Sequence, residues 1–156
     1  MKRYRIFLFF AALFLSITTS CSDSVETTPP DFVGSWQLAS YCGVPTEFDL
    51  YIQFKNNGQF VILQRNGSVG YTKYNGKYTA NEEACTISGV YNDGEKWANE
   101  YMYGLNNDNE LVLTTTSENA EVSVYRSAKM PTEGITNTIC NAVADGENAE
   151  NIIKPL

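Results

Sequence analysis

Histidine is absent from the 156 residues, and no two of the four cysteines stand in a Cys-x-x-Cys pair. Without imidazole, the Ser-His-Asp and Cys-His nucleophile systems are excluded, and the commonest transition-metal ligand is missing. Zinc sites usually need closely spaced cysteines, so none is expected. The loop at residues 106–110 has the oxygen-rich composition of a calcium site but lacks its glycine and its length. We therefore expect a protein that is not an enzyme, with no catalytic residue, metal or cofactor.

Basic residues are few as well: 11 Lys plus Arg face 18 Asp plus Glu. Three of these basic residues (Lys2, Arg3 and Arg5) precede position 20, so the rest of the chain is more acidic still. Nucleic acids and anionic membrane surfaces attract basic proteins, and we therefore expect no nucleic-acid partner. The acidic excess otherwise indicates a surface that favours solubility.

Long apolar runs are also missing, because the run from Ile6 to Ile17 is too short to span a bilayer as a permanent helix. Basic residues precede it and small residues follow it, which predicts a signal peptide over residues 1–20. The sequence Thr-Thr-Ser-Cys21 resembles the lipobox of bacterial lipoproteins, and this resemblance implies that Cys21 is lipidated. The acidic, proline-containing residues 21–31 are then a tether.

The lipobox resemblance implies a location as well. The leader is similar to those of lipoproteins of the Bacteroidetes group, whose acidic residues just after the cysteine can direct the protein to the cell surface. It implies an outer-membrane lipoprotein, on the periplasmic side or at the surface, with two acyl chains on Cys21 holding it to the outer membrane. The alternative is an ordinary cleaved signal peptide followed by a chance cysteine.

Three further cysteines remain in the mature chain: Cys42, Cys85 and Cys140. Exported proteins commonly form disulfides, but an odd number allows at most one bond within the chain. Their spacing does not decide which two pair.

The clearest strand pair lies at residues 48–54 and 60–65. Apolar residues alternate with polar ones in the first strand, which predicts one buried face (Phe48, Leu50, Ile52, Phe54). If Lys55 faces Gln59 across a three-residue loop, Gly58 takes the positive φ angle of a bulged hairpin. Phe60, Ile62 and Gln64 then join the same face.

More hairpins of this kind follow, and residues 32–130 are predicted to form one barrel. Eight strands rich in aromatic and β-branched residues are expected, separated by turn residues (36–41, 48–54, 60–65, 70–79, 85–91, 99–105, 111–115, 122–126). No room is left for crossover helices. The sequence therefore predicts an all-β fold, an eight-stranded antiparallel up-and-down barrel without exposed edges.

Residues 131–156 are predicted to be a C-terminal tail, because they show no strand alternation. A short helix is expected around residues 137–144, and Pro155 and Leu156 are expected to pack back on the barrel.

The strand series resembles a known family. Gly34-Ser35-Trp36 opens the first strand as in lipocalins, and Arg126 ends the last. This resemblance implies that Trp36 plugs one end of the barrel and that Arg126 lies over its ring, so that Gly34, Trp36 and Arg126 close the barrel. Residues 48–54, 64–65, 91–97 and 122–126 resemble the lipocalin-like lipoproteins of Bacteroides and relatives, which implies a lipocalin-like barrel with a binding role.

Ten tyrosines and two tryptophans crowd this chain, mostly in the middle strands. They are either the wall of a lumen that binds a small apolar or amphipathic molecule, or ordinary barrel packing. The candidate ligand-binding residues are Phe54, Ile62, Tyr78, Trp97, Tyr101 and Tyr103. Which side chains point inward depends on the hairpin at residues 92–95: a two-residue turn puts Val90 opposite Trp97, and a longer loop puts Tyr91 there.

A second function fits the same fold. The barrel would be a filled scaffold whose loops, residues 41–47 and 92–97, bind a surface protein or a glycan. An empty, tyrosine-lined lumen would favour ligand binding, whereas a filled lumen with an exposed Trp97 would favour the scaffold.

Overall fold

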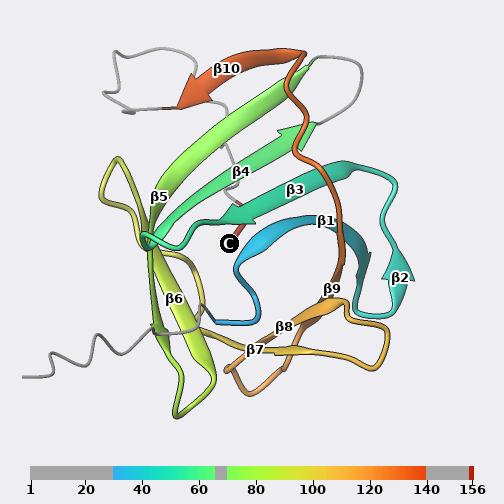
Figure 1. Cartoon of the computed structure of the whole chain (residues 1–156), viewed down its shortest axis with the longest axis vertical. Coiled ribbons are helices and arrows are strands. Elements are labelled where there is room, and N and C mark those ends of the chain that lie inside the picture. The colour runs from blue at the N-terminus through green and yellow to red at the C-terminus, as the bar shows by residue number, and fades with distance from the viewer. Residues whose placement is uncertain (1–29, 66–69, 140–154) are drawn as a thin grey trace, which may run out of the picture.

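The computed structural model of the chain describes residues 30–65, 70–139 and 155–156. Its strands form one closed ring around the core (Figure 1). Each barrel strand pairs antiparallel with the next one along the chain, and the last pairs with the first. The barrel strands are β1 (Gly34–Tyr41), β3 (Asp49–Phe54), β4 (Gln59–Arg65), β5 (Tyr71–Asn81), β6 (Thr86–Tyr91), β7 (Tyr101–Leu105), β8 (Leu111–Thr115) and β9 (Val122–Ser127).

This topology confirms the predicted fold, an eight-stranded up-and-down barrel of the lipocalin-like kind. A short strand, β2 (Val44–Pro45), pairs with the end of β1 within the connection to β3. In the part of the chain that the structure describes, no helix is long and apolar enough to cross a bilayer.

Three hairpins of the barrel share one three-residue loop. In each, the amide before the loop donates to the carbonyl after it (Lys55 to Gln59, Tyr91 to Glu95, Asn106 to Glu110), at 2.8–3.0 Å. The last loop residue has a positive φ angle (Gly58 76°, Gly94 91°, Asn109 57°). This backbone conformation favours Gly and Asn, which explains the residues found there. The predicted loop between β3 and β4 is thus confirmed.

The same loop decides the register of the next hairpin. Because Tyr91 faces Glu95, Val90 pairs with Lys96, and the amide of Trp97 donates to the carbonyl of Gly89 at 2.9 Å. Trp97 therefore lies opposite Gly89, and both predicted registers are wrong. The indole covers the glycine so closely that a Cβ on Gly89 would stand 2.3 Å from the ring. Glycine is required here so that Trp97 can turn into the barrel.

The expected tail contains one more strand, β10 (Ile135–Ile139), which pairs parallel with the start of β5. The prediction of a tail without strands is wrong here, as is the predicted helix over residues 137–139, while residues 140–144 lie outside the described residues. The reason is the length of β5. Its partner β6 pairs only with residues 76–81, so the first half of β5 has an edge for β10 to pair with.

Candidate functional site

One end of the barrel is closed by the chain ahead of β1, which folds across the inside of the ring (Figure 1). Trp36 is buried, and its Nε1 donates to the carbonyl of Phe32 at 2.8 Å. The Phe32 ring packs edge-on against Phe54 at 5.2 Å and Tyr103 at 4.6 Å. Gly34 lies beside the Trp36 indole, where a Cβ would stand 3.5 Å from Nε1. We call this group (Phe32, Trp36, Phe54, Tyr78, Tyr103) the closed end.

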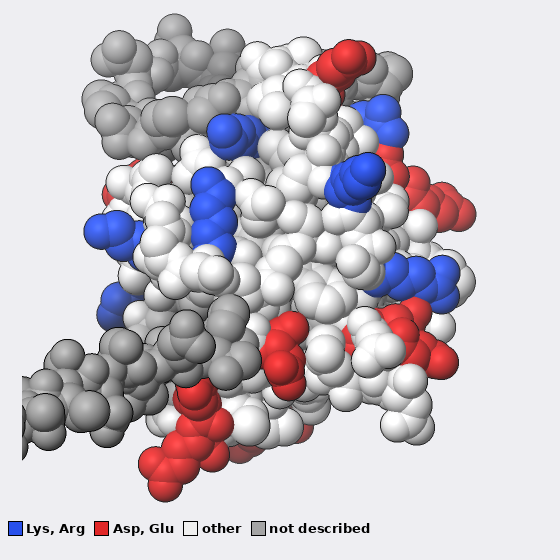
Figure 2. All heavy atoms as spheres, in the orientation of Figure 1, with Lys and Arg blue, Asp and Glu red and all other residues white. Residues whose placement is uncertain are grey.

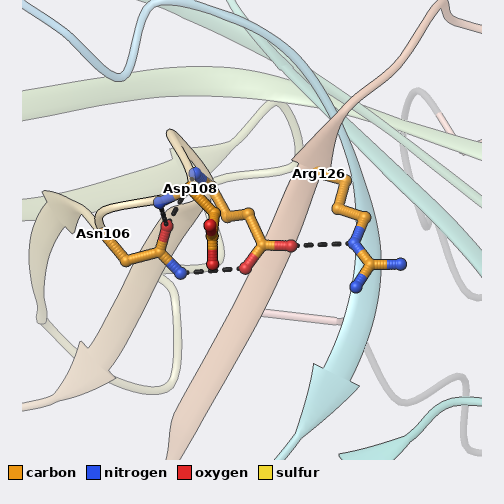
Figure 3. A network of polar contacts seen from close by, with 4 residues as sticks. Asn106, Asp108 and Arg126 are labelled. Carbon is orange, nitrogen blue, oxygen red and sulfur yellow. Dashed lines mark hydrogen bonds and ion pairs between the residues drawn. The ribbon is translucent and has the colours of Figure 1, made fainter.

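Arg126 does not take part in the closed end, and the prediction that it lies over the Trp36 ring is wrong. Its guanidinium is on the outer face, where Nε donates to Glu110 at 2.8 Å (Figure 3). Asn106 donates to the other carboxylate oxygen of Glu110, also at 2.8 Å. Side chains alternate along a strand, so the inward position of Tyr125 forces Arg126 outward, whereas Trp36 faces inward.

The predicted ligand-binding residues all lie in or against the core. Phe54, Ile62, Trp97 and Tyr101 are buried, and Tyr78 and Tyr103 are partly buried against them. They divide into two groups. Phe54, Tyr78 and Tyr103 belong to the closed end, whereas Trp97 and Tyr101 contact each other at 6.0 Å in a second group of rings.

The second group contains side chains that the sequence analysis did not single out as ligand-binding. Phe60 contacts both Tyr91, at 5.4 Å, and Trp97, at 5.1 Å, and Tyr91 also contacts Tyr74 at 6.2 Å. The two groups meet where Phe54 contacts Trp97 at 6.4 Å. The turn Asn-Asp-Gly at residues 92–94 matches Asn-Asn-Gly at residues 56–58. This match indicates the hairpin register that brings Tyr91 and Trp97 into the second group.

Leu156 completes this second group, although it belongs to none of the strands. It is buried in the core, and the chain end marked C lies inside the ring of strands (Figure 1). Its amide donates to the Tyr91 hydroxyl at 3.1 Å, and that hydroxyl donates to its carbonyl oxygen at 3.2 Å. Leu156 does pack back on the barrel as predicted, but from within. We call this group (Phe60, Tyr74, Tyr91, Trp97, Tyr101, Leu156) the Tyr91 site.

The polar side-chain groups of the Tyr91 site are uncharged. Burial raises the pKa of the Tyr91 and Tyr101 hydroxyls, so both keep their protons at neutral pH. The indole Nε1 of Trp97 is buried and has no hydrogen-bond partner among the described residues. Buried donors normally find an acceptor, and this one lies against Gly89 in the barrel wall.

The charged side chains in the described part of the chain lie on the outside. Thr115 is the only polar or charged residue among those buried in the described part of the chain. On the face drawn in Figure 2, basic side chains lie mainly over the upper half and acidic ones along the lower half and the edge. The buried interior of the described part of the chain is therefore almost entirely apolar.

Exposed apolar side chains gather at the turn that leads from β1 to β3. Tyr41, Val44 and Phe48 are 42%, 66% and 44% exposed. Glu121, a hydrogen-bond partner of the Tyr41 hydroxyl, raises the pKa of Tyr41 to about 12. The neighbouring Cys42 is an exposed free thiol, as is Cys85, so these two cysteines are not paired with each other. Cys21 and Cys140 lie outside the described residues.

Comparison with known proteins adds one structure. No family model and no curated protein matches the sequence. A lipocalin-like protein from Bacteroides uniformis is similar in structure, with a TM-score of 0.49 and 20% sequence identity over 63% of this chain and 99% of that one. The assignment of the fold rests on the strand pairing described above.

Proposed function

We propose that the barrel binds a small apolar or amphipathic molecule at the Tyr91 site. The observation that carries this proposal is the position of Leu156, which lies in the core although it belongs to no strand. The side chains of the strands therefore do not fill this part of the interior by themselves, and a ligand could occupy the same space. At the closed end, by contrast, the rings come from the strands and the segment that leads into them.

The chemistry of the site limits the ligand. Its walls are aromatic rings and its polar side-chain groups are neutral, which favours a molecule with an apolar body. The Nε1 of Trp97, which has no partner among the described residues, and the hydroxyl of Tyr91 supply hydrogen bonds for one polar head group. The ligand-binding part of the predicted set is then Trp97 and Tyr101, with Ile62 next to Tyr74 in the barrel wall.

Titration with the apolar dye N-phenyl-1-naphthylamine tests this proposal. We expect dye fluorescence to rise on binding, and Trp97→Phe to weaken binding roughly tenfold, because part of the aromatic wall is lost. Tyr41→Phe, which changes an exposed ring outside the site, is the matched control and leaves the affinity unchanged. If the dye does not bind, and native mass spectrometry finds no adduct on the protein from its own kind of host, the proposal fails.

We further propose that the protein is an outer-membrane lipoprotein, anchored through Cys21, and that it has no catalytic activity. The lipobox-like sequence and the acidic stretch behind it support the anchor. Radioactive palmitate should label the wild type and the Cys42→Ser control but not Cys21→Ser. A wild type without label would end the lipoprotein proposal.

A second candidate function is a surface module that binds a protein or a glycan. The exposed apolar side chains of Tyr41, Val44 and Phe48 favour it, because the first two lie on the loop expected to bind a partner, residues 41–47, and Phe48 follows it directly. Replacing all three with serine should abolish binding to a glycan array or to intact cells. Met102→Ser, a change at another exposed apolar residue, should leave such binding intact. Binding that survives the triple change would exclude this loop.

A further inference from the structure

We propose that the Tyr91 site recognises a branched aliphatic chain attached next to an amide or carboxyl group, and that Leu156 occupies it as a built-in competitor that such ligands displace. The inference rests on the proposed function, and it adds both the class of ligand and its regulation. N-acylated amino acids and the ends of apolar peptides have this chemistry.

The contacts of Leu156 define the ligand class. Both its amide and its carbonyl oxygen bond to one atom, the Tyr91 hydroxyl, at 3.1 and 3.2 Å. Its side chain is buried with the surrounding rings of the core. A hydroxyl that donates once and accepts once matches a head group with an N–H and an oxygen side by side. A ligand of this kind can take over both hydrogen bonds.

The site also has a binding group that Leu156 does not use. Trp97 is 6% exposed, and its Nε1 is without a partner among the described residues. Phe60 contacts both Trp97 and Tyr91, so the unused donor lies in the same group of rings as the hydroxyl that holds Leu156. A ligand with one acceptor more than Leu156 gains a hydrogen bond by replacing it.

Leu156 is suited to be displaced because it is not part of the barrel. Its removal breaks no strand pairing, since Pro155 and Leu156 lie outside all strands. A tethered occupant competes at a high effective concentration, so it lowers the apparent affinity of free ligands by a constant factor. Weakening the occupant should therefore strengthen ligand binding.

The experiment uses the full chain with Leu156→Ala, and Leu105→Ala as the matched control at an exposed leucine on β7. We expect N-phenyl-1-naphthylamine to bind the Leu156→Ala chain about tenfold more tightly than wild type, which is the effect of losing most of one buried leucine side chain. The Leu105→Ala chain should bind like the wild type. Tyr91→Phe, which removes the hydroxyl that holds Leu156 but keeps the ring, should also tighten dye binding.

A peptide tests the ligand class directly. Ile-Ile-Lys-Pro-Leu, the sequence of residues 152–156, should displace the dye from the Leu156→Ala chain. Ile-Ile-Lys-Pro-Ala should displace it at least about tenfold less well. Circular dichroism verifies that each variant keeps its strands.

The outcomes separate the two proposals. If the dye binds wild type, Leu156→Ala and Leu105→Ala equally, or if the leucine peptide competes no better than the alanine peptide, the built-in competitor is wrong and the binding site stands. If the dye binds none of the folded chains, the proposed function itself fails, and this inference with it.

Discussion

The closed end and the Tyr91 site are both packed with aromatic rings, but they are filled from different sources. At the closed end, Phe32 and Trp36 come from the strand β1 and the segment that leads into it, and they are joined by a hydrogen bond of 2.8 Å. At the Tyr91 site, the space is completed by Leu156, which is 65 residues away from Tyr91 along the chain. The residues that fill the closed end belong to a barrel strand or the segment next to it, whereas Leu156 lies outside all strands.

Because of this difference, one part of the core should determine the stability of the barrel and another part its ligand binding. A plug formed by residues next to a strand cannot leave unless the barrel itself unfolds. A residue outside the strands can leave while all strand pairs stay intact. Substitutions at the closed end should therefore lower the stability of the whole protein, and substitutions of Leu156 should mainly alter ligand binding.

The largest expected effect is that of Trp36→Ala. Removing this buried indole leaves a cavity and an unpaired Phe32 carbonyl, and should lower the free energy of unfolding by about 3–5 kcal/mol. Denaturant unfolding followed by circular dichroism measures this loss, with the exposed Val44→Ala as the control. A nearly unchanged midpoint would mean that Trp36 does not close the barrel.

Alkaline pH should act on the Tyr91 site. Burial raises the pKa of Tyr91 and Tyr101 above 10, the ordinary value that they regain on unfolding. The stabilisation is complete below pH 10 and is lost as the pH rises above it, because the unfolded chain ionises first. Each such tyrosine lowers the free energy of unfolding by up to about 1.4 kcal/mol per pH unit. Unfolding curves from pH 8 to 11 measure the slope, which Tyr91→Phe should reduce. An equal slope in Tyr91→Phe would contradict the assignment.

A smaller effect is expected for Leu156→Ala. Loss of the side chain should lower the free energy of unfolding by only about 1 kcal/mol. The reason is that the barrel remains folded when residues 155–156 detach from the core. Ile62→Ala, at a fully buried strand position, should cost about 2–5 kcal/mol. Denaturant midpoints of the two variants compare them. Equal losses would show that Leu156 is as integral to the core as a strand residue.

The barrel itself was predictable because its signals are local. Alternation predicted that Phe48, Leu50, Ile52 and Phe54 share one buried face, and the last three are buried. The prediction is wrong for Phe48, which precedes β3 and is 44% exposed. The loop Asn-Asn-Gly58 fixed the register of the first hairpin. The closely similar loop Asn-Asp-Gly94 has the same hydrogen bond across it, and this places Trp97 opposite Gly89.

The contacts that the sequence did not predict are nonlocal. The turn residues indicate which strand positions lie beside Tyr91. Nothing in residues 155–156, however, predicts that Leu156 enters the barrel. β10 pairs parallel with β5 because the first half of β5 has a free edge. That edge exists because β6 pairs only with residues 76–81 of β5. Arg126 was misplaced because its direction depends on the inward position of Tyr125.

The smallest expected effect is that of Arg126→Ala. Its guanidinium pairs with Glu110 on the exposed outer face, where water and salt screen the interaction (Figure 3). The pKa of Glu110 is lowered by its hydrogen bonds to Arg126 and Asn106, so the carboxylate is charged at neutral pH and keeps Asn106 as a partner when Arg126 is removed. The denaturant midpoint of Arg126→Ala should match that of the wild type within error. A double-mutant cycle with Trp36→Ala should give no coupling, since the two side chains point to opposite faces of the barrel wall. A clear coupling energy would mean that the arginine does reach the indole in solution, and that the closed end is held together from both sides of the wall.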